Sequence, residues 1–357
     1  MTRIRNESTA ALTRRRLLKT GAAAGALLTA PSLMRGVAAA EDNTVYVGTW
    51  GGAWGRAQEA CFNKPFTERT GIKCVAVGGV SLAKVKAMVE NGTYDFDICD
   101  MNYPQAEHDK LVQPMDRSVM DFTNISPEGV VGNGLRDATF ATQLVYRKDK
   151  FPNGGPKNWA DFWDVKKFPG RRSLNTRPNT IIEFALMADG VPPDKVYPLD
   201  IERAFKKLNE IKPHITVWWS QIVEATRLIH DGEVDMISLW SSGVKMLKDT
   251  NDPVEVVWNQ AHLEVGGAFY VIKGTPRAKN AFKYLEFFHD PKQHAEFCRT
   301  LAFGPGNPKC FDYMSKEEIA LAPTAPQNWS IGVVPDYDWL TPRNAMLQER
   351  FSQWQAG

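Results

Sequence analysis

The stretch from Thr44 to Cys74 constrains the fold of this 357-residue chain more than any other segment. Val45 and Val47 alternate with a tyrosine in a short β-branched run, which predicts a strand. Four glycines then break that period, and a helical pattern begins near Trp54 and ends at Gly71, where a second strand starts. A strand, a helix and another strand in this order predict a parallel α/β unit.

Two tryptophans, Trp50 and Trp54, lie in and just after the glycine-rich turn that follows the first predicted strand. Ligands of open α/β sheets bind outside the carboxyl ends of the strands, which is where this turn lies. Both indoles are therefore candidates for ligand contact, and the alternative is that they are ordinary core packing.

The alternation of strands and helices continues through most of the chain. A third strand ends in Asp100 and Asn102, and a second α/β unit follows from about residue 148 to 264. Strand-like runs at Thr139–Arg147 and Gly266–Gly274 flank that second unit. The order predicts an α/β protein of two lobes whose chain crosses between them twice, and such crossings act as hinges for closure around a ligand.

Smaller signals fix individual elements. Three aromatic residues at helical spacing predict core packing by Trp159, Phe162 and Trp163. Thr341, followed by a proline, is the expected N-cap of the last helix.

The first 40 residues have the pattern of an export signal. A basic region containing Arg14 and Arg15 precedes a short alanine-rich apolar stretch and the small residues before Glu41. The arginine pair resembles a twin-arginine signal, and the apolar stretch is too short for a membrane anchor. We expect a periplasmic protein that begins near Glu41; the alternative is a cytosolic protein with a basic amphipathic start.

Charge excludes several classes of partner. Beyond residue 40 the chain has 36 basic and 40 acidic residues, so its net charge is about −4. A chain with this balance has no excess of basic residues of the kind that binds nucleic acid or anionic lipid.

Five cysteines would lie in an oxidising compartment, where disulfides form. Proximity in the sequence favours the pairs Cys61–Cys74 and Cys298–Cys310, with Cys99 as a buried thiol. The sequence alone leaves the connectivity open.

Six segments in order carry a resemblance to a known family: YVGTWGGAW with KPFTERTGIK, YDFDICDMNY with LVQPMD, NWADFWD with FPG, GEVDMISLWSSG, GTPRAKNAF and FGPGNP. Together they resemble the periplasmic substrate-binding proteins of ABC importers, in the branch of the spermidine/putrescine receptors (extracellular solute-binding protein family 1). The resemblance implies a two-lobed periplasmic-binding-protein fold, type II-like, with two parallel or mixed sheets and covering helices. It implies a soluble receptor, acting as a monomer, that delivers a small amine-containing solute to a permease in the inner membrane, without catalysis or cofactor.

The implied domains follow the two crossings. Residues 1–40 are the removed signal, 41–140 with 267–315 form lobe 1, and 141–266 form lobe 2. Residues 316–357 are C-terminal helices that pack on the lobes.

The resemblance also implies a ligand site. It places an aromatic residue after the first strand, which matches Trp50 with Trp54 nearby, and cleft residues at the end of the third strand, which match Asp100 and Asn102. A tryptophan of the second lobe matches Trp240. The stretch around the second crossing offers Tyr270.

One loop departs from the polyamine-receptor pattern. Where polyamine receptors carry acids, this chain has Arg177 and Thr180 at the start of a helix, and a helix N-terminus favours negative charge by ~0.3–1 kcal/mol. A dication against Arg177 would cost several kcal/mol, more than stacking aromatics return at roughly 0.5–2 kcal/mol each. We therefore expect a small amine-containing solute. Among amino-acid-like, opine-like and polyamine-like solutes, we favour a zwitterion with an amine for Asp100 and the indoles and a carboxylate for Arg177 and Thr180. The alternatives are an internal salt bridge or a solvent-facing charge for Arg177 and a structural role for Asp100.

Two rival functions have less support. A twin-arginine-exported enzyme would need a motif, but no G-x-G-x-x-G, P-loop, G-x-S-x-G or H-E-x-x-H occurs. A metal-ion receptor would need a convergent ligand cluster, and Asp100, Tyr103 and His108 are a mixed set.

Overall fold

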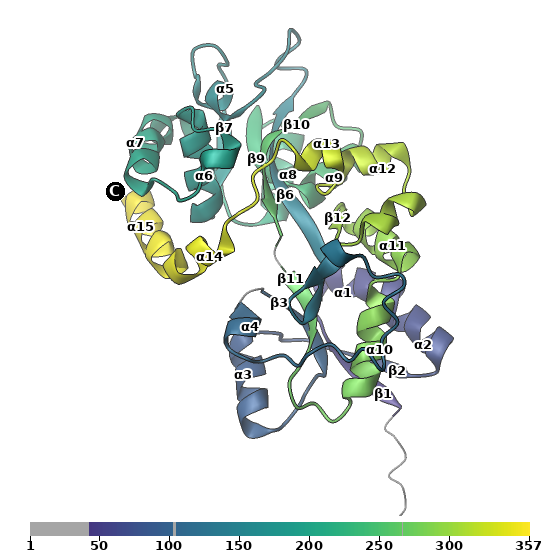
Figure 1. Ribbon diagram of the computed structural model, residues 1–357. Helices are drawn as coiled ribbons and strands as arrows, with labels where there is room; N and C mark the ends of the chain where they lie inside the picture. The colour runs from purple at the N-terminus through teal and green to yellow at the C-terminus, as the bar shows by residue number, and fades with distance from the viewer. Residues whose placement is uncertain (1–42, 103–104, 266) are drawn as a thin grey trace, which may run out of the picture. The chain divides into compact units, whose positions relative to one another are not determined.

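The computed structural model describes residues 43–102, 105–265 and 267–357, so the predicted export signal lies outside the described residues. The strands form two mixed sheets, and Figure 1 shows helices against each of them. Both sheets belong to one compact unit, Asp42–Gly357.

The first sheet is built from the opening α/β unit and from one strand that returns late in the sequence. β1 pairs in parallel with β2 and β3, whereas β11 is antiparallel to β3 and to β5. The strands in spatial order are β2 (Lys73–Val77), β1 (Thr44–Gly48), β3 (Ile98–Asn102), β11 (Gly267–Val271), β5 (Gly134–Arg136) and β4 (Val130–Val131).

Local capping interactions define the ends of α3 (Leu82–Asn91) in the first sheet. The Ser81 side chain accepts a hydrogen bond from the Lys84 N–H, and Gly92 closes the same helix in the left-handed conformation that favours glycine. The helical segments are α1 (Gly52–Gln58), the π-helical η1 (Glu59–Asn63), α2 (Lys64–Thr70), α3 (Leu82–Asn91), α4 (Gln105–His108), the 3₁₀ turn η2 (Pro127–Gly129), α10 (Ala278–Phe288) and α11 (Pro291–Leu301).

Aromatic side chains fill the core on the α10 and α11 side of the first sheet. Phe269 of β11 stacks on Phe288 with ring centroids 4.2 Å apart, and Phe62 lies 4.4 Å from Phe288. Val45 and Val47 are fully buried beneath them, as the alternation in β1 predicts.

The second sheet holds the strands of the middle of the chain. In spatial order they are β10 (Val254–Glu264), β6 (Ala138–Arg147), β9 (Met236–Trp240), β7 (Arg172–Asn175) and β8 (Ile215–Trp219), with β12 (Gly304–Pro305) also paired to β6. β7 is parallel to β8 and β9, and β6 is antiparallel to β9 and β10. Its helical segments are α5 (Trp159–Trp163), α6 (Pro178–Ala188), η3 (Pro193–Lys195), α7 (Ile201–Ile211), η4 (Lys212–His214), α8 (Ile222–His230) and α9 (Ser241–Asp249).

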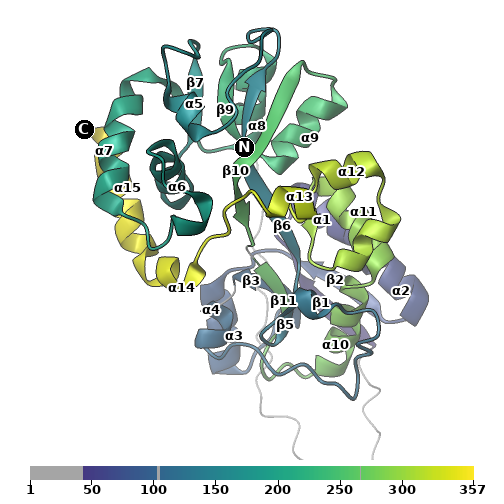
Figure 2. The same cartoon turned by 45° about the horizontal axis from the view of Figure 1, so that its top comes forward.

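The C-terminal segment packs largely on the second sheet's helices. Leu347 and Phe351 of α15 are buried in the same core as α6, and Figure 2 shows α15 beside α6 and α7. The elements are η5 (Pro308–Tyr313), α12 (Lys316–Leu321), α13 (Pro326–Trp329), α14 (Tyr337–Leu340), η6 (Thr341–Arg343) and α15 (Asn344–Ala356). The N-cap prediction for Thr341 is wrong: Asp336 caps α14, and Thr341 has helical backbone angles that continue into η6.

The chain crosses between the sheets twice, as predicted. Sheet membership changes between Arg136 and Ala138, and again between Glu264 and Gly267. The predicted fold class, two mixed α/β sheets with covering helices and two crossovers, is confirmed; the exact lobe limits stay a prediction.

The predicted disulfides are absent, because all five cysteines are free thiols. Cys61 lies beside Thr300 and Glu296, whereas Cys74 hydrogen-bonds with Thr67, so these two thiols have different neighbours. Burial raises the pKa of both, to about 11 and about 12 respectively. Among the described residues, no helix combines the length and apolar character that a bilayer crossing requires.

We predict that Trp159→Ala lowers the free energy of unfolding by about 3–5 kcal/mol in urea denaturation. Trp159 is fully buried, stacks on Phe184 at 3.6 Å, and donates its indole N–H to the Gln260 carbonyl at 2.9 Å. Trp329, 39% exposed, is the control, and its replacement by alanine should change stability by less than about 0.5 kcal/mol. Equal losses in the two variants would contradict the assignment of Trp159 to the core.

Candidate functional site

An exposed tryptophan is anchored to an acid at the carboxyl ends of β1 and β3. The Trp50 indole N–H donates to Asp100 Oδ2 at 2.7 Å, although 55% of the residue is exposed. β1 and β3 are parallel neighbours, so their carboxyl ends meet at one edge, as the sequence predicts. The hydrogen bond fixes one edge of an indole that is more than half exposed.

A second acid, Asp137, completes this cluster, and the sequence analysis missed it. The Asp137 carboxyl hydrogen-bonds with Asp100. Asp100 Oδ1 is buried and has no hydrogen-bond partner among the described residues. Both acids pack on Gly267 of β11, where a β-carbon would collide with the Asp100 carboxylate and lie 2.8 Å from Asp137 Oδ2. Only glycine leaves room for this acid pair.

The acid pair is held partly protonated by its surroundings. Burial raises the pKa of Asp100 to about 6, against the lowering effect of hydrogen bonds from Trp50 and Asp137. Burial, and then the charge of Asp100, raise the pKa of Asp137 well above its ordinary value. Ionising two carboxyl groups in contact costs free energy because their negative charges repel each other. A cation bound here would therefore stabilise the second negative charge.

A second cluster surrounds Arg177 on the other sheet. Arg177 is the N-cap residue of α6, and its Nη1 lies 2.9 Å and 3.2 Å from the two carboxylate oxygens of Glu264. Its guanidinium lies over the Trp240 ring at 4.4 Å and near Phe140 at 6.0 Å. The internal salt bridge, one of the alternatives for Arg177, is therefore present. Nε and Nη2 have no hydrogen-bond partner in the described part of the chain, and the side chain is 41% exposed.

The two clusters lie at opposite ends of the same two crossing segments. Asp137 is three residues before Phe140, and Glu264 is three residues before Gly267. Three residues of extended chain span at most roughly 10 Å, so the acid pair and the arginine cluster are within reach of one small molecule.

Three predicted site residues lie among other side chains of the protein. Trp54 is partly buried and packs edge-on against Phe297 at 4.9 Å, and Thr180 is fully buried in the first turn of α6. Tyr270 is fully buried and donates its hydroxyl to the Val131 carbonyl at 3.3 Å. Its strand, β11, lies between β3 and β5 within the first sheet. The Asn102 side chain lies outside the described residues.

Asp137 and Glu264 were not predicted as site residues, although their positions in the sequence offered a weak signal. Asp137 and Glu264 are the acids that flank the two crossing strands, one just before β6 and one at the end of β10. The sheet register places Glu264 opposite Phe140 and Trp240 opposite Thr142, which gathers them at one end of the second sheet.

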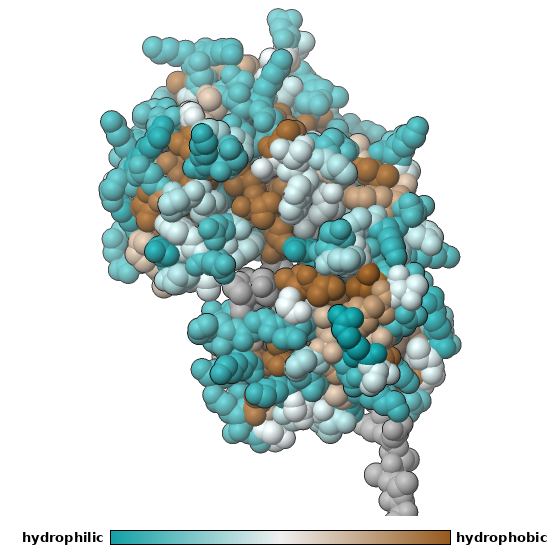
Figure 3. All heavy atoms as spheres, viewed as in Figure 1, coloured by the Kyte–Doolittle hydropathy of each residue, from teal (hydrophilic) through white to brown (hydrophobic). Residues whose placement is uncertain are grey.

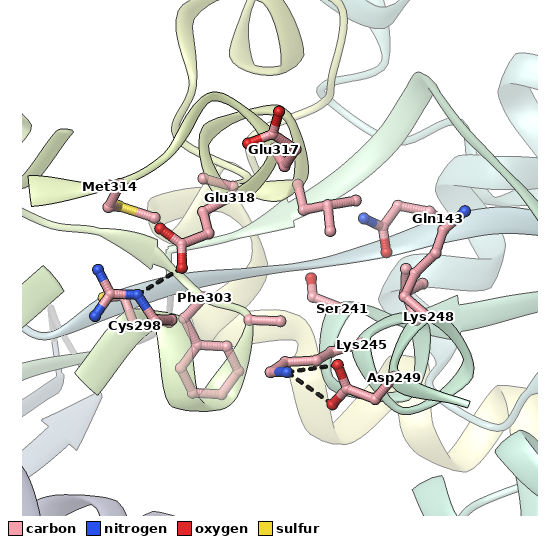
Figure 4. A pocket seen from close by; sticks show the side chains of 15 residues that line it. Gln143, Ser241, Lys245, Lys248, Asp249, Cys298, Phe303, Met314, Glu317 and Glu318 are labelled. Atoms are coloured by element: carbon pink, nitrogen blue, oxygen red, sulfur yellow. Dashed lines mark hydrogen bonds and ion pairs between the residues drawn. The ribbon is translucent and has the colours of Figure 1, made fainter. Parts of the chain in front are cut away.

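The described residues also form cavities away from these clusters, and these include the following two. One, of about 200 Å³, lies between α9, α11 and α12; Figure 4 shows its ion pairs Lys245–Asp249 and Arg299–Glu318. The other, of about 480 Å³, is lined by α4 and by Tyr337 and neighbouring residues of the C-terminal segment. Neither contains a predicted site residue. The face in Figure 3 is mostly hydrophilic, with hydrophobic side chains gathered near its middle.

In the described part of the chain, no group of three or more His, Cys, Asp or Glu side chains is arranged to hold a metal ion. His108 pairs with Asp109 at 2.9 Å, and Tyr103 lies outside the described residues.

Two mixed α/β sheets, linked by two crossing segments that carry a charged and aromatic site, define a two-lobed solute-binding protein. The chain belongs to the bacterial extracellular solute-binding proteins, whose family model matches residues 62–327. The resemblance to substrate-binding proteins of ABC importers is confirmed, and this is a transport family rather than an enzyme family.

Relatives of known identity cover nearly the whole chain. The γ-aminobutyric acid (GABA)-binding protein of Pseudomonas aeruginosa is 29% identical over 89% of this chain and 93% of its own length. The spermidine/putrescine-binding periplasmic protein of Escherichia coli is 23% identical over 79% and 83%.

Solved structures agree with the fold. An ABC transporter substrate-binding protein from Bradyrhizobium japonicum superposes with a TM-score of 0.79 at 34% identity, covering 87% of this chain and 99% of the other. A solved GABA receptor superposes with a TM-score of 0.78 at 30% identity, covering 87% and 97%.

We predict that Asp137→Asn stabilises the ligand-free protein at pH 7.5 by about 1–2 kcal/mol, with little gain at pH 4. Both acids have pKa values raised above those of the unfolded chain, so the folded state binds more protons above about pH 4, and the contribution of this pair to stability falls as the pH rises. Asparagine has no proton to lose, so the variant lacks the part of this pH-dependent loss that comes from Asp137. Urea denaturation at the two pH values measures the change.

Asp194→Asn is the matched control for this prediction. Asp194 is exposed in η3, so its replacement should leave the pH profile unchanged. A profile in Asp137→Asn that parallels the wild type would argue against a coupled acid pair.

Proposed function

We propose that this protein is a periplasmic receptor that delivers a small zwitterion, with an amine and a carboxylate a few bonds apart, to an ABC importer. The observation that carries the proposal is the placement of opposite charges: an acid pair at one end of the two crossing segments and Arg177 at the other. The GABA-binding relatives support the same class of solute.

The amine end is assigned to the acid pair. An ammonium group donates hydrogen bonds and attracts the second negative charge, which displaces the proton that Asp137 holds. The exposed Trp50 face adds a cation–π contact worth about 0.5–2 kcal/mol.

The carboxylate end is assigned to Arg177. Its Nη1 is used by Glu264, and the remaining guanidinium donors can make charge-assisted hydrogen bonds of about 2.8 Å to a carboxylate. Trp240 beneath the guanidinium helps to fix its direction.

The spacing selects the length of the solute. The Cα atoms of Asp137 and Phe140, one in each cluster, are at most roughly 10 Å apart, so a short solute can reach both clusters. That span suits a short ω-amino acid better than a long polyamine.

A diamine such as putrescine is the second candidate, and Glu264 favours it. Glu264 neutralises part of the Arg177 charge and could accept a second ammonium if Arg177 turned away. The spermidine/putrescine-binding relatives support this alternative. Breaking the Arg177 ion pair, which also stacks on Trp240, opposes it.

Transport requires no bond to be made or broken. The lobes close on the solute about the two crossing segments, and the closed form docks on the permease. We infer a monomer exported by the signal in residues 1–40.

We predict that GABA raises the apparent stability of the purified protein by about 2.7 kcal/mol at a hundredfold excess over its dissociation constant. Butylamine, which lacks the carboxylate, and butyrate, which lacks the amine, should each shift it much less. Thermal-shift and calorimetric titrations with these compounds and with putrescine give the measurement. A shift by putrescine without one by GABA or another zwitterion would reverse the assignment of Arg177.

We predict that Trp50→Ala weakens binding of every amine ligand, whereas Arg177→Gln weakens GABA binding about 30-fold or more and leaves butylamine nearly unchanged. The reason is that Trp50 contacts the amine end and Arg177 the carboxylate end. Trp329→Ala, which changes another exposed tryptophan, is the control and should bind as the wild type does.

A further inference from the structure

A row of four charged side chains leads from the buried core of the second sheet to Arg177. Glu183 and His262 are both fully buried, and His262 Nδ1 lies 2.6 Å from Glu183 Oε2. His262 Nε2 lies 3.9 Å from Glu264 Oε2, and Glu264 pairs with Arg177 at 2.9 Å. The order of charges is acid, imidazole, acid, guanidinium.

Local structure explains why these four side chains meet. His262 and Glu264 are two residues apart on β10, so they project from the same face of the sheet. Arg177 caps α6, and Glu183 lies nearly two turns further along the same helix. α6 packs on β10, so one helix and one strand supply all four side chains of this row.

The surroundings of the imidazole favour its charged form. Burial lowers the pKa of His262, but the charge and hydrogen bond of Glu183, with the charge of Glu264, outweigh burial and raise it above the ordinary value. Without this cation, two glutamates would face one arginine, and Glu183 would be a buried acid without a counter-charge.

Other titratable groups also lie next to this row of charged side chains. Tyr197 donates its hydroxyl to Glu183, and Asp336 lies near Tyr197. Tyr337 of α14 lies near Glu264 and Glu183, and Arg136 of β5 is also close to it.

We propose that His262 is a positioning residue that fixes Glu264, and through it Arg177, for binding of the ligand carboxylate. This inference rests on the proposed function and deepens it. Glu264 competes with a ligand carboxylate for the same guanidinium. The His262 cation draws Glu264 toward the core and shares its charge, which leaves Nε and Nη2 of Arg177 for the ligand. Loss of the imidazolium therefore weakens carboxylate recognition and leaves amine recognition unchanged.

The test is His262→Gln, which keeps a hydrogen-bond donor but no charge. We expect at least a tenfold loss of GABA affinity by calorimetric titration at pH 6.5, with butylamine affinity unchanged within twofold. The ratio of GABA to butylamine affinity should fall with rising pH in the wild type, as His262 loses its proton, and should be flatter in the variant.

Tyr197→Phe is the matched control. It removes the other hydrogen bond to Glu183 without touching Glu264, so it should lower stability but leave the GABA to butylamine ratio unchanged. If His262→Gln lowers the affinities of both compounds equally, or Tyr197→Phe changes the ratio as much, the role of His262 is only structural and the proposal is overturned.

Glu264→Gln covers the case in which His262→Gln does not fold. With the competing acid gone, the pH dependence of the GABA to butylamine ratio should disappear even though His262 is intact; a retained dependence would refute the proposal.

If the wild-type protein binds no zwitterion at all, the proposed function fails and this inference fails with it. If the wild type binds GABA and His262→Gln is indistinguishable from it, only the inference fails.

Discussion

The contact between Asp100 and Asp137 is the interaction on which the rest of the site depends. Two carboxyl groups share one buried edge of the first sheet, and Gly267 alone allows them to approach. Their arrangement is costly when both are charged, so the pair holds a proton until a cation arrives. The exposed Trp50 donates a hydrogen bond to Asp100 of this pair, so the aromatic and the charged groups that would contact the ligand lie side by side.

The opposite end of the site is built from the same two crossing segments. Phe140 follows Asp137, and Glu264 precedes Gly267, so each crossing carries one group toward each end. Arg177 is added by the N-terminus of α6 and is held between Glu264 and Trp240. A fold whose hinges also carry its charged contacts couples ligand recognition directly to movement about those hinges.

The sequence predicted the two-sheet architecture because alternating strands and helices with well-placed caps leave few other arrangements. Trp50 and Arg177 could be predicted as site candidates because each occupies an element end that the pattern defines. Asp137 was missed because its contact with Asp100 arises only when the residue between β5 and β6 meets β11 and β3, and no local pattern encodes that contact. The burial of Tyr270 was not predicted because its sequence neighbours do not reveal that β11 lies inside the sheet rather than at its edge.

Proton release on binding is the most direct measurement of the central claim. Calorimetric titration of the wild type with GABA at pH 6.5, in buffers of different ionisation enthalpy, counts the protons exchanged. The acid pair predicts a net release that becomes much smaller in Asp137→Asn. Binding of GABA with no proton exchanged, or with equal release by both proteins, would contradict the assignment of the amine to the acid pair.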